Sequence, residues 1–279
     1  MDYVVEVQLT LRPSRGGPNM QAKIRMSIVG AIVILLLATL SEAADLAKIQ
    51  KQLEPYYNTY RPDGSGPFPA VMMVSGCSGF RPSIAPTGYT RRAEALKAQG
   101  FLVIFVDYLA RRRLGRCFEN GRYIVDTDDV AEDILASGAH LRSLSYVNVD
   151  QITAMGWSYG GGGVLAALGR IRPADAAPFQ RAVAFYPVCR DIRPWKAPVP
   201  VLMLLGALDD VAPADACQSL VKKVPAGTPV DVHIYPEARH AFDTPELPPV
   251  MKDAINRTLG YNEAAATAAW DETYKFLKH

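Results

Sequence analysis

The sequence predicts an α/β fold with a mostly parallel central sheet and helices on both faces. From residue 68 onward, short apolar runs rich in β-forming residues alternate with segments of helical spacing. Most of the runs are continuous, which is typical of strands buried on both faces. Strand–helix alternation of this kind indicates a parallel sheet covered by helices. The expected strands span residues 70–74, 101–106, 152–156, 182–186, 199–205 and 230–235.

The same alternation indicates one domain. At 279 residues, 49% of them hydrophobic, the chain is long enough for one large α/β domain, which we expect at residues 68–279. Residues 44–67 are expected to form an N-terminal surface arm that begins as a helix and ends in a loop. The expected helices span residues 90–99, 128–144, 158–169, 215–224 and 263–277.

Residues 1–43 contain the layout of a secretory signal peptide. Lys23 and Arg25 precede an apolar run over residues 28–40, and residues 41–43 place small side chains at the cleavage positions. The run is shorter than the roughly 20 residues that a membrane-spanning helix needs. We therefore expect cleavage, export to the periplasm or out of the cell, and no stable membrane span afterwards. An uncleaved N-terminal anchor is the alternative.

The segment before this signal bears on where translation begins. Residues 1–19 precede a second methionine, Met20, and are mixed in polarity, so they have no place in a signal peptide. We therefore expect Met1 to be a mis-assigned start and the true start to be Met20 or Met26.

The charge composition argues against a nucleic-acid partner. The chain holds 30 basic and 28 acidic residues and has a formal net charge of +2. A nucleic-acid-binding face would normally bring a strong basic excess. We therefore expect no nucleic acid, and so ordinary a composition indicates no particular oligomeric state.

The four cysteines all lie beyond the expected cleavage site. An even number of cysteines in an exported protein favours disulfides. None forms a CxxC pair or stands near a histidine at zinc-ligand spacing, so no metal site is expected. Sequence order and the expected fold favour two pairs, Cys77 with Cys117 and Cys189 with Cys217. Buried free thiols are the alternative, because pairing requires a specific geometry.

A glycine-rich stretch surrounds one serine at residues 154–165, which read AMGWSYGGGGVL. A phosphate-binding P-loop would need a lysine after the glycines, and a dinucleotide fingerprint would need GxGxxG spacing; neither is present. The stretch does match G-x-S-x-G, with Ser158 between an expected strand and an expected helix. This pattern is typical of a nucleophile elbow, a tight turn that exposes the serine hydroxyl.

A serine nucleophile requires a base and a carboxylate that orients the base. His240 is the histidine that follows an expected strand end, where loops of parallel sheets carry function. His140, His233 and His279 fall in a helix, in a strand and at the terminus, and we interpret them as structural. Asp209 and Asp210 both follow the strand at 199–205. Asp209 is the preferred triad member and Asp210 a solvated neighbour or loop cap. The order Ser158, Asp209, His240 is that of an α/β-hydrolase.

Two backbone amides are expected to form an oxyanion hole. One belongs to Tyr159, directly after the serine, and the other to Cys77 in the loop VSGCSGF after the strand at 70–74. The alternative for the second is a tight glycine loop without a catalytic role.

Three further side chains are candidates for substrate binding. Arg112 and Arg113 lie in a loop with five arginines, where a guanidinium group can anchor a carboxylate or phosphate. A solvated basic loop is the alternative. Phe80 is a candidate for the wall of an apolar acyl pocket, as are Tyr159 and Trp157, although core packing behind the elbow is the preferred interpretation for Trp157.

Six stretches of the sequence together resemble the dienelactone hydrolase family of α/β-hydrolases. The similarity runs from roughly residue 68 to the C-terminus. Two positions depart from the family pattern. Members that act on dienelactone carry a cysteine nucleophile where this chain has Ser158, and many relatives have a histidine where it has Ser75. The stretches are SGCSGF, FVDYLARRR, GWSYGGG, GALDDVAPADAC, YPEARHAFD and YNEAAATAAWDETYKFL.

The resemblance implies the α/β-hydrolase fold, with a sheet of eight strands or slightly fewer. It also implies ester or lactone hydrolysis by Ser158, Asp209 and His240 without a metal or organic cofactor. We therefore expect an exported serine hydrolase whose partner is a small-molecule ester or lactone. The alternatives are a serine peptidase or acyltransferase on the same fold, or a catalytically inactive binding member.

Overall fold

The structure is a computed structural model that describes residues 4–11, 20–27, 29, 44–80, 88–172, 176–253 and 255–278. The chain forms two compact units, Met1–Lys48 and Ile49–His279. In the first, β1 (Val4–Leu11) pairs antiparallel with β2 (Met20–Ser27). The predicted signal sequence at 28–43 lies outside the described residues, apart from Val29. Among the helices in the described ranges, none has the length and hydropathy that a bilayer crossing requires.

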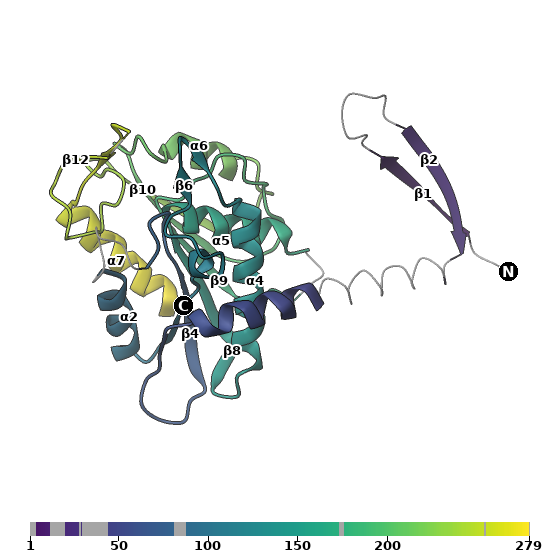
Figure 1. Cartoon of the computed structure of the whole chain (residues 1–279), viewed down its shortest axis with the longest axis horizontal. Helices are drawn as coiled ribbons and strands as arrows, with labels where there is room; N and C mark the ends of the chain where they lie inside the picture. The colour runs from purple at the N-terminus through teal and green to yellow at the C-terminus, as the bar shows by residue number, and fades with distance from the viewer. Residues whose placement is uncertain are drawn as a thin grey trace. The chain divides into compact units, whose positions relative to one another are not determined.

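The larger unit is built on a seven-stranded sheet in the order β11-β10-β9-β8-β4-β5-β3 (Figure 1). Neighbouring strands from β11 to β5 pair in parallel, whereas β3 pairs antiparallel with β5 at the edge. All six predicted strands are present, which confirms the expected fold class. The strands are β3 (Thr59–Tyr60), β4 (Phe68–Val74), β5 (Leu102–Phe105), β8 (Val147–Trp157), β9 (Arg181–Phe185), β10 (Val201–Gly206) and β11 (Val230–Tyr235).

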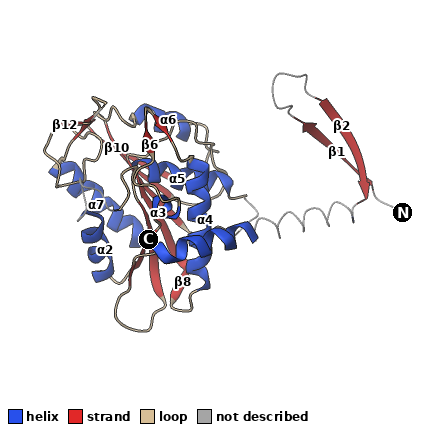
Figure 2. Ribbon diagram, viewed as in Figure 1, coloured by secondary structure: helices blue, strands red, loops and turns tan. Residues whose placement is uncertain are grey.

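Helices cover both faces of this sheet. α2 and α7 lie on one side, and α4 and α5 lie on the other (Figure 2). Each predicted helix corresponds to one of the observed helices. These are α2 (Gly88–Ala98), α4 (Thr127–Ser143), α5 (Ser158–Arg170), α6 (Ala214–Val221) and α7 (Glu263–Lys278). Shorter elements complete the unit: η1 (Glu54–Tyr56), α3 (Tyr108–Arg111), β6 (Phe118–Glu119), β7 (Arg122–Tyr123), β12 (Met251–Lys252) and β13 (Thr258–Leu259).

The central strands are buried on both faces, as their continuous apolar sequences predict. In β4, every residue from Ala70 to Val74 is fully buried. Val71 and Met73 pack in one cluster with Leu96 of α2 and Ala269 of α7. Because side chains alternate along a strand, the residues between them face the opposite layer of helices.

The segment before β4 joins the sheet. Residues 44–53 are helical, as predicted, and Leu53 is fully buried. Strand β3 then lies along β5, where Phe105 N–H donates to the Asn58 carbonyl at 3.0 Å. The hydroxyls of Tyr57 and Ser137 lie 2.9 Å apart, which ties this segment to α4. Two residues of strand are too few to give a periodic sequence signal, so this edge strand was not predicted.

Helices α4 and α5 approach each other closely at Gly163. A Cβ atom built on Gly163 would overlap the side chain of Val130 in α4. The four consecutive glycines of α5 therefore serve packing as well as the turn before them, since a bulkier residue would separate the helices.

We expect Gly163→Ala to destabilise the protein by about 1–3 kcal/mol, because an extra methyl group has no room between α4 and α5. The higher helix propensity of alanine offsets about 1 kcal/mol of this effect at most. Urea unfolding measures the change. Gly169→Ala in the same helix is the matched control, because its Cβ would lie 3.2 Å from the Arg193 carbonyl oxygen and requires only a small shift. Equal losses for the two variants would contradict the packing argument.

Candidate active site

The turn between β8 and α5 has the geometry of a nucleophile elbow. Strand β8 ends at Trp157 and α5 begins at Ser158, whose φ of 51° lies in the left-handed region. A non-glycine residue adopts this conformation only when the surrounding structure imposes it. A Cβ on Gly156 would overlap the Gly160 carbonyl, and a Cβ on Gly160 would overlap the carbonyl of Ser75 in the neighbouring loop. Both glycines of G-x-S-x-G are therefore required by close backbone contacts.

Ser158, His240 and Asp209 form a continuous hydrogen-bonded chain. Ser158 Oγ lies 2.8 Å from His240 Nε2, and His240 Nδ1 lies 2.7 Å from Asp209 Oδ2. The other oxygen of Asp209 accepts hydrogen bonds from the N–H groups of Val211 and Ala212, each at 2.8 Å. An ionised Asp209 accepts the Nδ1 proton, which leaves Nε2 free to accept the serine proton. Asp209 and His240 are each only 5% exposed.

The three side chains come from loops at the carboxyl ends of neighbouring strands. Ser158 follows β8, Asp209 follows β10 and His240 follows β11. The histidine loop is held by β13, because Gly260 N–H donates to the His240 carbonyl at 3.0 Å and Leu259 forms a bridge with His240. The sheet edge thus brings together the three residues that the sequence predicted for a triad.

Asp210 lies beside Asp209 in sequence and has a different set of contacts. Its two carboxylate oxygens accept hydrogen bonds from the backbone N–H and the hydroxyl of Thr258, at 2.7 and 2.8 Å. Asp210 therefore anchors β13 to this loop, as expected for a loop cap.

Two further histidines, His140 and His233, lie outside this constellation. His140 is in α4, where its Nδ1 lies 3.2 Å from Gln50 Nε2. Burial lowers the pKa of His140. His233 is in β11, with Nε2 3.1 Å from Asp231 Oδ2. His279 lies outside the described residues.

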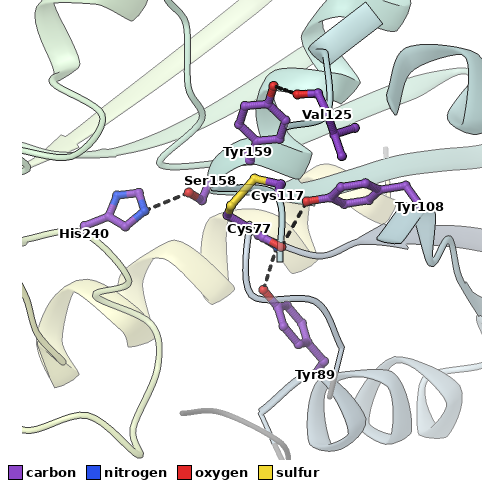
Figure 3. The surroundings of a disulfide bond; sticks show 9 residues. Cys77, Tyr89, Tyr108, Cys117, Val125, Ser158, Tyr159 and His240 are labelled. Carbon is purple, nitrogen blue, oxygen red and sulfur yellow. Dashed lines mark hydrogen bonds between the residues drawn. A yellow bond between two sulfur atoms is a disulfide. The ribbon is translucent and has the colours of Figure 1, made fainter. Parts of the chain in front are cut away.

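The residues expected to form an oxyanion hole border the same cavity as Ser158. Cys77 lies in the loop after β4, and Tyr159 is the second residue of α5. The loop passes close to the serine, since a Cβ on Gly76 would lie 3.4 Å from Ser158 Cβ. Figure 3 shows Cys77 and Tyr159 on either side of Ser158. The backbone atoms of Cys77 and Tyr159 are therefore near the position where a substrate carbonyl would meet the serine.

A cavity of about 190 Å³ opens at Ser158 and His240. Most of its wall is aromatic or aliphatic, which suits the apolar part of a small molecule. Trp157 is 1% exposed and packs in the core, as predicted, while also reaching this wall. The apolar residues that line this cavity include Tyr89, Trp157, Tyr186, Ala241, Leu247 and Leu259.

A second cavity of about 1010 Å³ adjoins the first and is lined largely by polar groups. Arg257 and Tyr123 border both cavities. Arg257 Nε donates to Asp253 Oδ2 at 2.7 Å, and its guanidinium lies 5.4 Å from the ring centre of Phe118. Tyr123 is 41% exposed, with its ring stacked on Tyr159 at 4.4 Å. The charged side chains of the second cavity are Arg122, Asp126, Arg190, Asp191, Asp215 and Arg257.

Of the residues predicted to contact substrate, Tyr159 borders both cavities and Trp157 borders the smaller one, whereas Phe80, Arg112 and Arg113 line neither. Phe80 is buried and stacks on Phe105 with ring centres 4.3 Å apart. The guanidinium of Arg112 forms an ion pair and hydrogen bond with the buried Asp133, and Arg113 is exposed to solvent. A buried carboxylate requires a partner of opposite charge, which accounts for the position of Arg112.

A buried carboxylate behind the elbow was not predicted from the sequence. Asp243, three residues after His240, is 1% exposed. Its Oδ1 accepts a hydrogen bond from the Tyr186 hydroxyl at 2.6 Å. Its Oδ2 accepts from the indole N–H of Trp157 at 3.1 Å and from that of Trp270 at 3.3 Å. Asp243 thus connects the histidine loop to the residue before the nucleophile.

Arg92 of α2 balances the charge of Asp243. Arg92 Nη2 lies 2.8 Å from Asp243 Oδ2, and the arginine side chain is 11% exposed. Burial raises the pKa of Tyr186, and the negative charge of Asp243 adds to that shift, so the phenol stays protonated and donates. The edge of the Tyr186 ring packs on His240, with ring centres 4.8 Å apart. The network therefore supports the position of the imidazole.

The fold and the cavity at Ser158 define a hydrolase of the α/β-hydrolase fold. A model of the dienelactone hydrolase family matches residues 57–279, and the chain belongs to this family of carboxylic ester hydrolases. A relative, the quorum-quenching protein AidA of Acinetobacter baumannii (strain MDR-ZJ06), is 32% identical over 107 residues. That match covers 38% of this chain and 33% of AidA, so it spans only a third of that protein's length.

Solved structures show the same fold. A candidate dienelactone hydrolase from Klebsiella pneumoniae subsp. pneumoniae MGH 78578 superposes with a TM-score of 0.62 at 18% identity, over 100% of both chains. Esterase 2 of Thermogutta terrifontis, solved with propionate bound, has a TM-score of 0.53 at 16% identity, over 79% of this chain and 88% of its own.

We expect Asp243→Ala to destabilise the protein by about 3–5 kcal/mol, because it leaves the buried guanidinium of Arg92 without its counter-charge. Replacing both members with apolar residues, as Arg92→Met with Asp243→Leu, should be less destabilising than the single change. Denaturant unfolding of the two variants measures the difference. Glu132→Ala breaks a surface pair with Arg170 and is the control, with an expected change below about 1 kcal/mol. A double variant less stable than Asp243→Ala would contradict the pairing.

Proposed function

We propose that the protein is an exported serine hydrolase that cleaves small carboxylic esters or lactones with Ser158, His240 and Asp209. The observation that carries the proposal is the hydrogen-bonded chain from Ser158 Oγ through His240 to Asp209, with links of 2.8 and 2.7 Å, at an elbow that borders a small apolar cavity. This is the geometry in which a base activates a serine hydroxyl near neutral pH.

The proposed reaction has two halves. His240 Nε2 takes the proton of Ser158 as Oγ attacks the ester carbonyl, and then gives that proton to the departing alcohol. The acyl group remains on Oγ. A water molecule, deprotonated by His240, attacks this acyl-enzyme and releases the acid, and the proton returns to Ser158. In both halves Asp209 holds the tautomer of His240 and stabilises the imidazolium.

The backbone N–H groups of Cys77 and Tyr159 are the proposed donors to the oxyanion. Tyr159 lies in the first turn of α5, where backbone amides point out of the helix end and the helix dipole favours negative charge. One such donor typically contributes about 3 kcal/mol to the transition state.

Two cysteine pairs support the proposed export. Cys77 bonds to Cys117 and Cys189 bonds to Cys217, with Cα–Cα distances of 4.8 and 5.0 Å. These are the predicted pairs. Disulfides persist in oxidising compartments such as the periplasm or the extracellular medium, and are rare in the cytosol.

We expect Ser158→Ala to lower kcat for p-nitrophenyl acetate about 10⁵–10⁶-fold and to abolish labelling by a fluorophosphonate probe, because the nucleophile is lost. Asp209→Asn should lower kcat about 10⁴-fold, since the amide favours the wrong tautomer of His240. Steady-state kinetics and intact-protein mass spectrometry measure the two effects.

Two other variants are the matched controls for these changes. Asp210→Asn changes the carboxylate that anchors Thr258, and His233→Gln changes the histidine of β11. Both variants should keep kcat within a few-fold of the wild-type value. A Ser158→Ala protein that retains turnover would contradict the proposal, and acyl transfer to an added alcohol in preference to water would indicate an acyltransferase instead.

We expect the protein to prefer short acyl chains, because the cavity at Ser158, which Leu247 and Leu259 border, has a volume of only about 190 Å³. Across nitrophenyl esters, kcat/KM should be at least about tenfold higher for acetyl to butyryl than for octanoyl. Leu247→Ala enlarges the cavity and should shift the optimum to longer chains. An unchanged profile in this variant would mean that the acyl group lies elsewhere, for example in the larger cavity.

A further inference from the structure

The loop that carries the proposed oxyanion donor Cys77 is covalently attached to the wall of the substrate cavity. Cys77 bonds to Cys117, 40 residues further along the chain. The N–H of Cys117 also donates to the Cys77 carbonyl at 2.9 Å, so the two segments share a disulfide and a hydrogen bond. Cys117 is fully buried, whereas Cys77 is half-buried and borders the cavity at Ser158.

The residue before Cys77 is held separately by two tyrosines. Gly76 N–H donates to the Tyr89 hydroxyl at 3.1 Å, and the Tyr108 hydroxyl donates to the Gly76 carbonyl at 3.2 Å (Figure 3). Burial raises the pKa of Tyr89 to about 12 and raises that of Tyr108 well above its usual value, so both hydroxyls stay protonated. The N–H and C=O of Gly76 belong to successive peptide planes, so the two tyrosines restrain both planes, and the second plane carries the N–H of Cys77.

After Gly76, the loop is attached at Cys77, which bonds to Cys117, and at Phe80, which packs on Phe105. Ser78 is exposed, and Gly79 N–H closes only a local turn back to the Gly76 carbonyl, at 3.1 Å. Cys117 is itself anchored, because its carbonyl accepts a hydrogen bond from Ile124 N–H at 2.9 Å. It stands directly before β6, next to Phe118 of the cavity wall. The disulfide is thus the covalent link between the end of the fixed loop and the segment 117–124.

We propose that the Cys77–Cys117 disulfide positions the oxyanion donor, and that turnover requires this bond to be oxidised. The inference rests on the proposed function. The donor is the backbone N–H of Cys77, in the Gly76–Cys77 peptide plane, whose carbonyl end is held by Tyr108 and whose Cα end is held by the disulfide. Reduction by a dithiol transfers two electrons and two protons to the bond and leaves thiols on both cysteines, while the dithiol closes to its own disulfide. The Cα of Cys77 then loses its covalent restraint and residues 76–77 keep only hydrogen bonds, so the amide can turn away from the oxyanion and activity falls in a reducing environment.

The second disulfide provides an internal control. Cys189–Cys217 closes a loop of 28 residues, comparable with 40 for Cys77–Cys117, so the two bonds restrain the unfolded chain to a similar extent. It joins the segment after β9 to α6 and does not involve the loop at 76–79. General destabilisation should therefore affect both bonds alike, whereas positioning of the donor should depend on Cys77–Cys117.

The experiment compares Cys77→Ser/Cys117→Ser with Cys189→Ser/Cys217→Ser in the full chain, using p-nitrophenyl acetate well below the melting temperature of each variant. Serine keeps the backbone N–H at residue 77, so only the covalent restraint is lost. We expect kcat of the first variant to fall about 10- to 100-fold with KM changed less than about threefold, because the complete loss of an oxyanion donor lowers kcat about 10²–10³-fold. The second variant should keep kcat within about twofold and lose a similar amount of thermal stability.

If the first variant does not fold, a titration of the wild-type protein with a dithiol tests the same inference. Thiol alkylation and peptide mass spectrometry follow each disulfide, and kcat should fall in step with reduction of Cys77–Cys117. Wild-type kcat after loss of that bond, or equal losses of kcat for the two bonds, would overturn the inference and leave the proposed function intact. Absence of Ser158-dependent turnover in the oxidised wild-type protein would overturn both.

Discussion

The left-handed backbone of Ser158 is the constraint on which the rest of the site depends. Strand β8 lies in the middle of the sheet and α5 packs directly against it, so the chain must reverse within a single residue. Only glycine fits at positions 156 and 160, where backbone approaches backbone. The serine is consequently presented at the start of α5 in a strained conformation that the packing of α4 and α5 maintains.

Two buried carboxylates then have separate tasks around the histidine loop. Asp209 accepts the Nδ1 proton of His240 and two backbone amides, so its charge is directed at the ring. Asp243 forms an ion pair with Arg92 and accepts hydrogen bonds from Tyr186, Trp157 and Trp270. It therefore links the elements that surround the histidine loop. Placing both charges out of water is favourable only because each has a full set of donors.

The features that could be predicted from the sequence are those that depend on residues close together in the chain. Continuous apolar runs identify the buried strands, and the glycine spacing around Ser158 identifies the elbow. The rule that function follows strand ends then selects His240 and Asp209. Features that depend on distant partners were missed. Arg112 reads as a free cation until Asp133, 21 residues away on α4, is seen to bind it. Asp243 reads as an ordinary loop residue, because its partners come from α2, β8, α7 and the segment after β9. Tyr123 and Arg257 reach the cavities from short loops and two-residue strands that carry no periodic signal.

Each loop that carries a proposed catalytic group is anchored to the fold at a different place. The histidine loop is bound by β13 and by Asp243, and the loop at Cys77 is bound by two tyrosines and a disulfide. Independent anchoring lets donors and base hold their positions before substrate arrives, which is the condition for electrostatic stabilisation of a transition state. The walls of the larger cavity are built differently, from the hairpin β6–β7 and the partly exposed Tyr123. The same hairpin follows directly after Cys117, so this wall of the larger cavity is covalently tied to the loop that carries the proposed oxyanion donor.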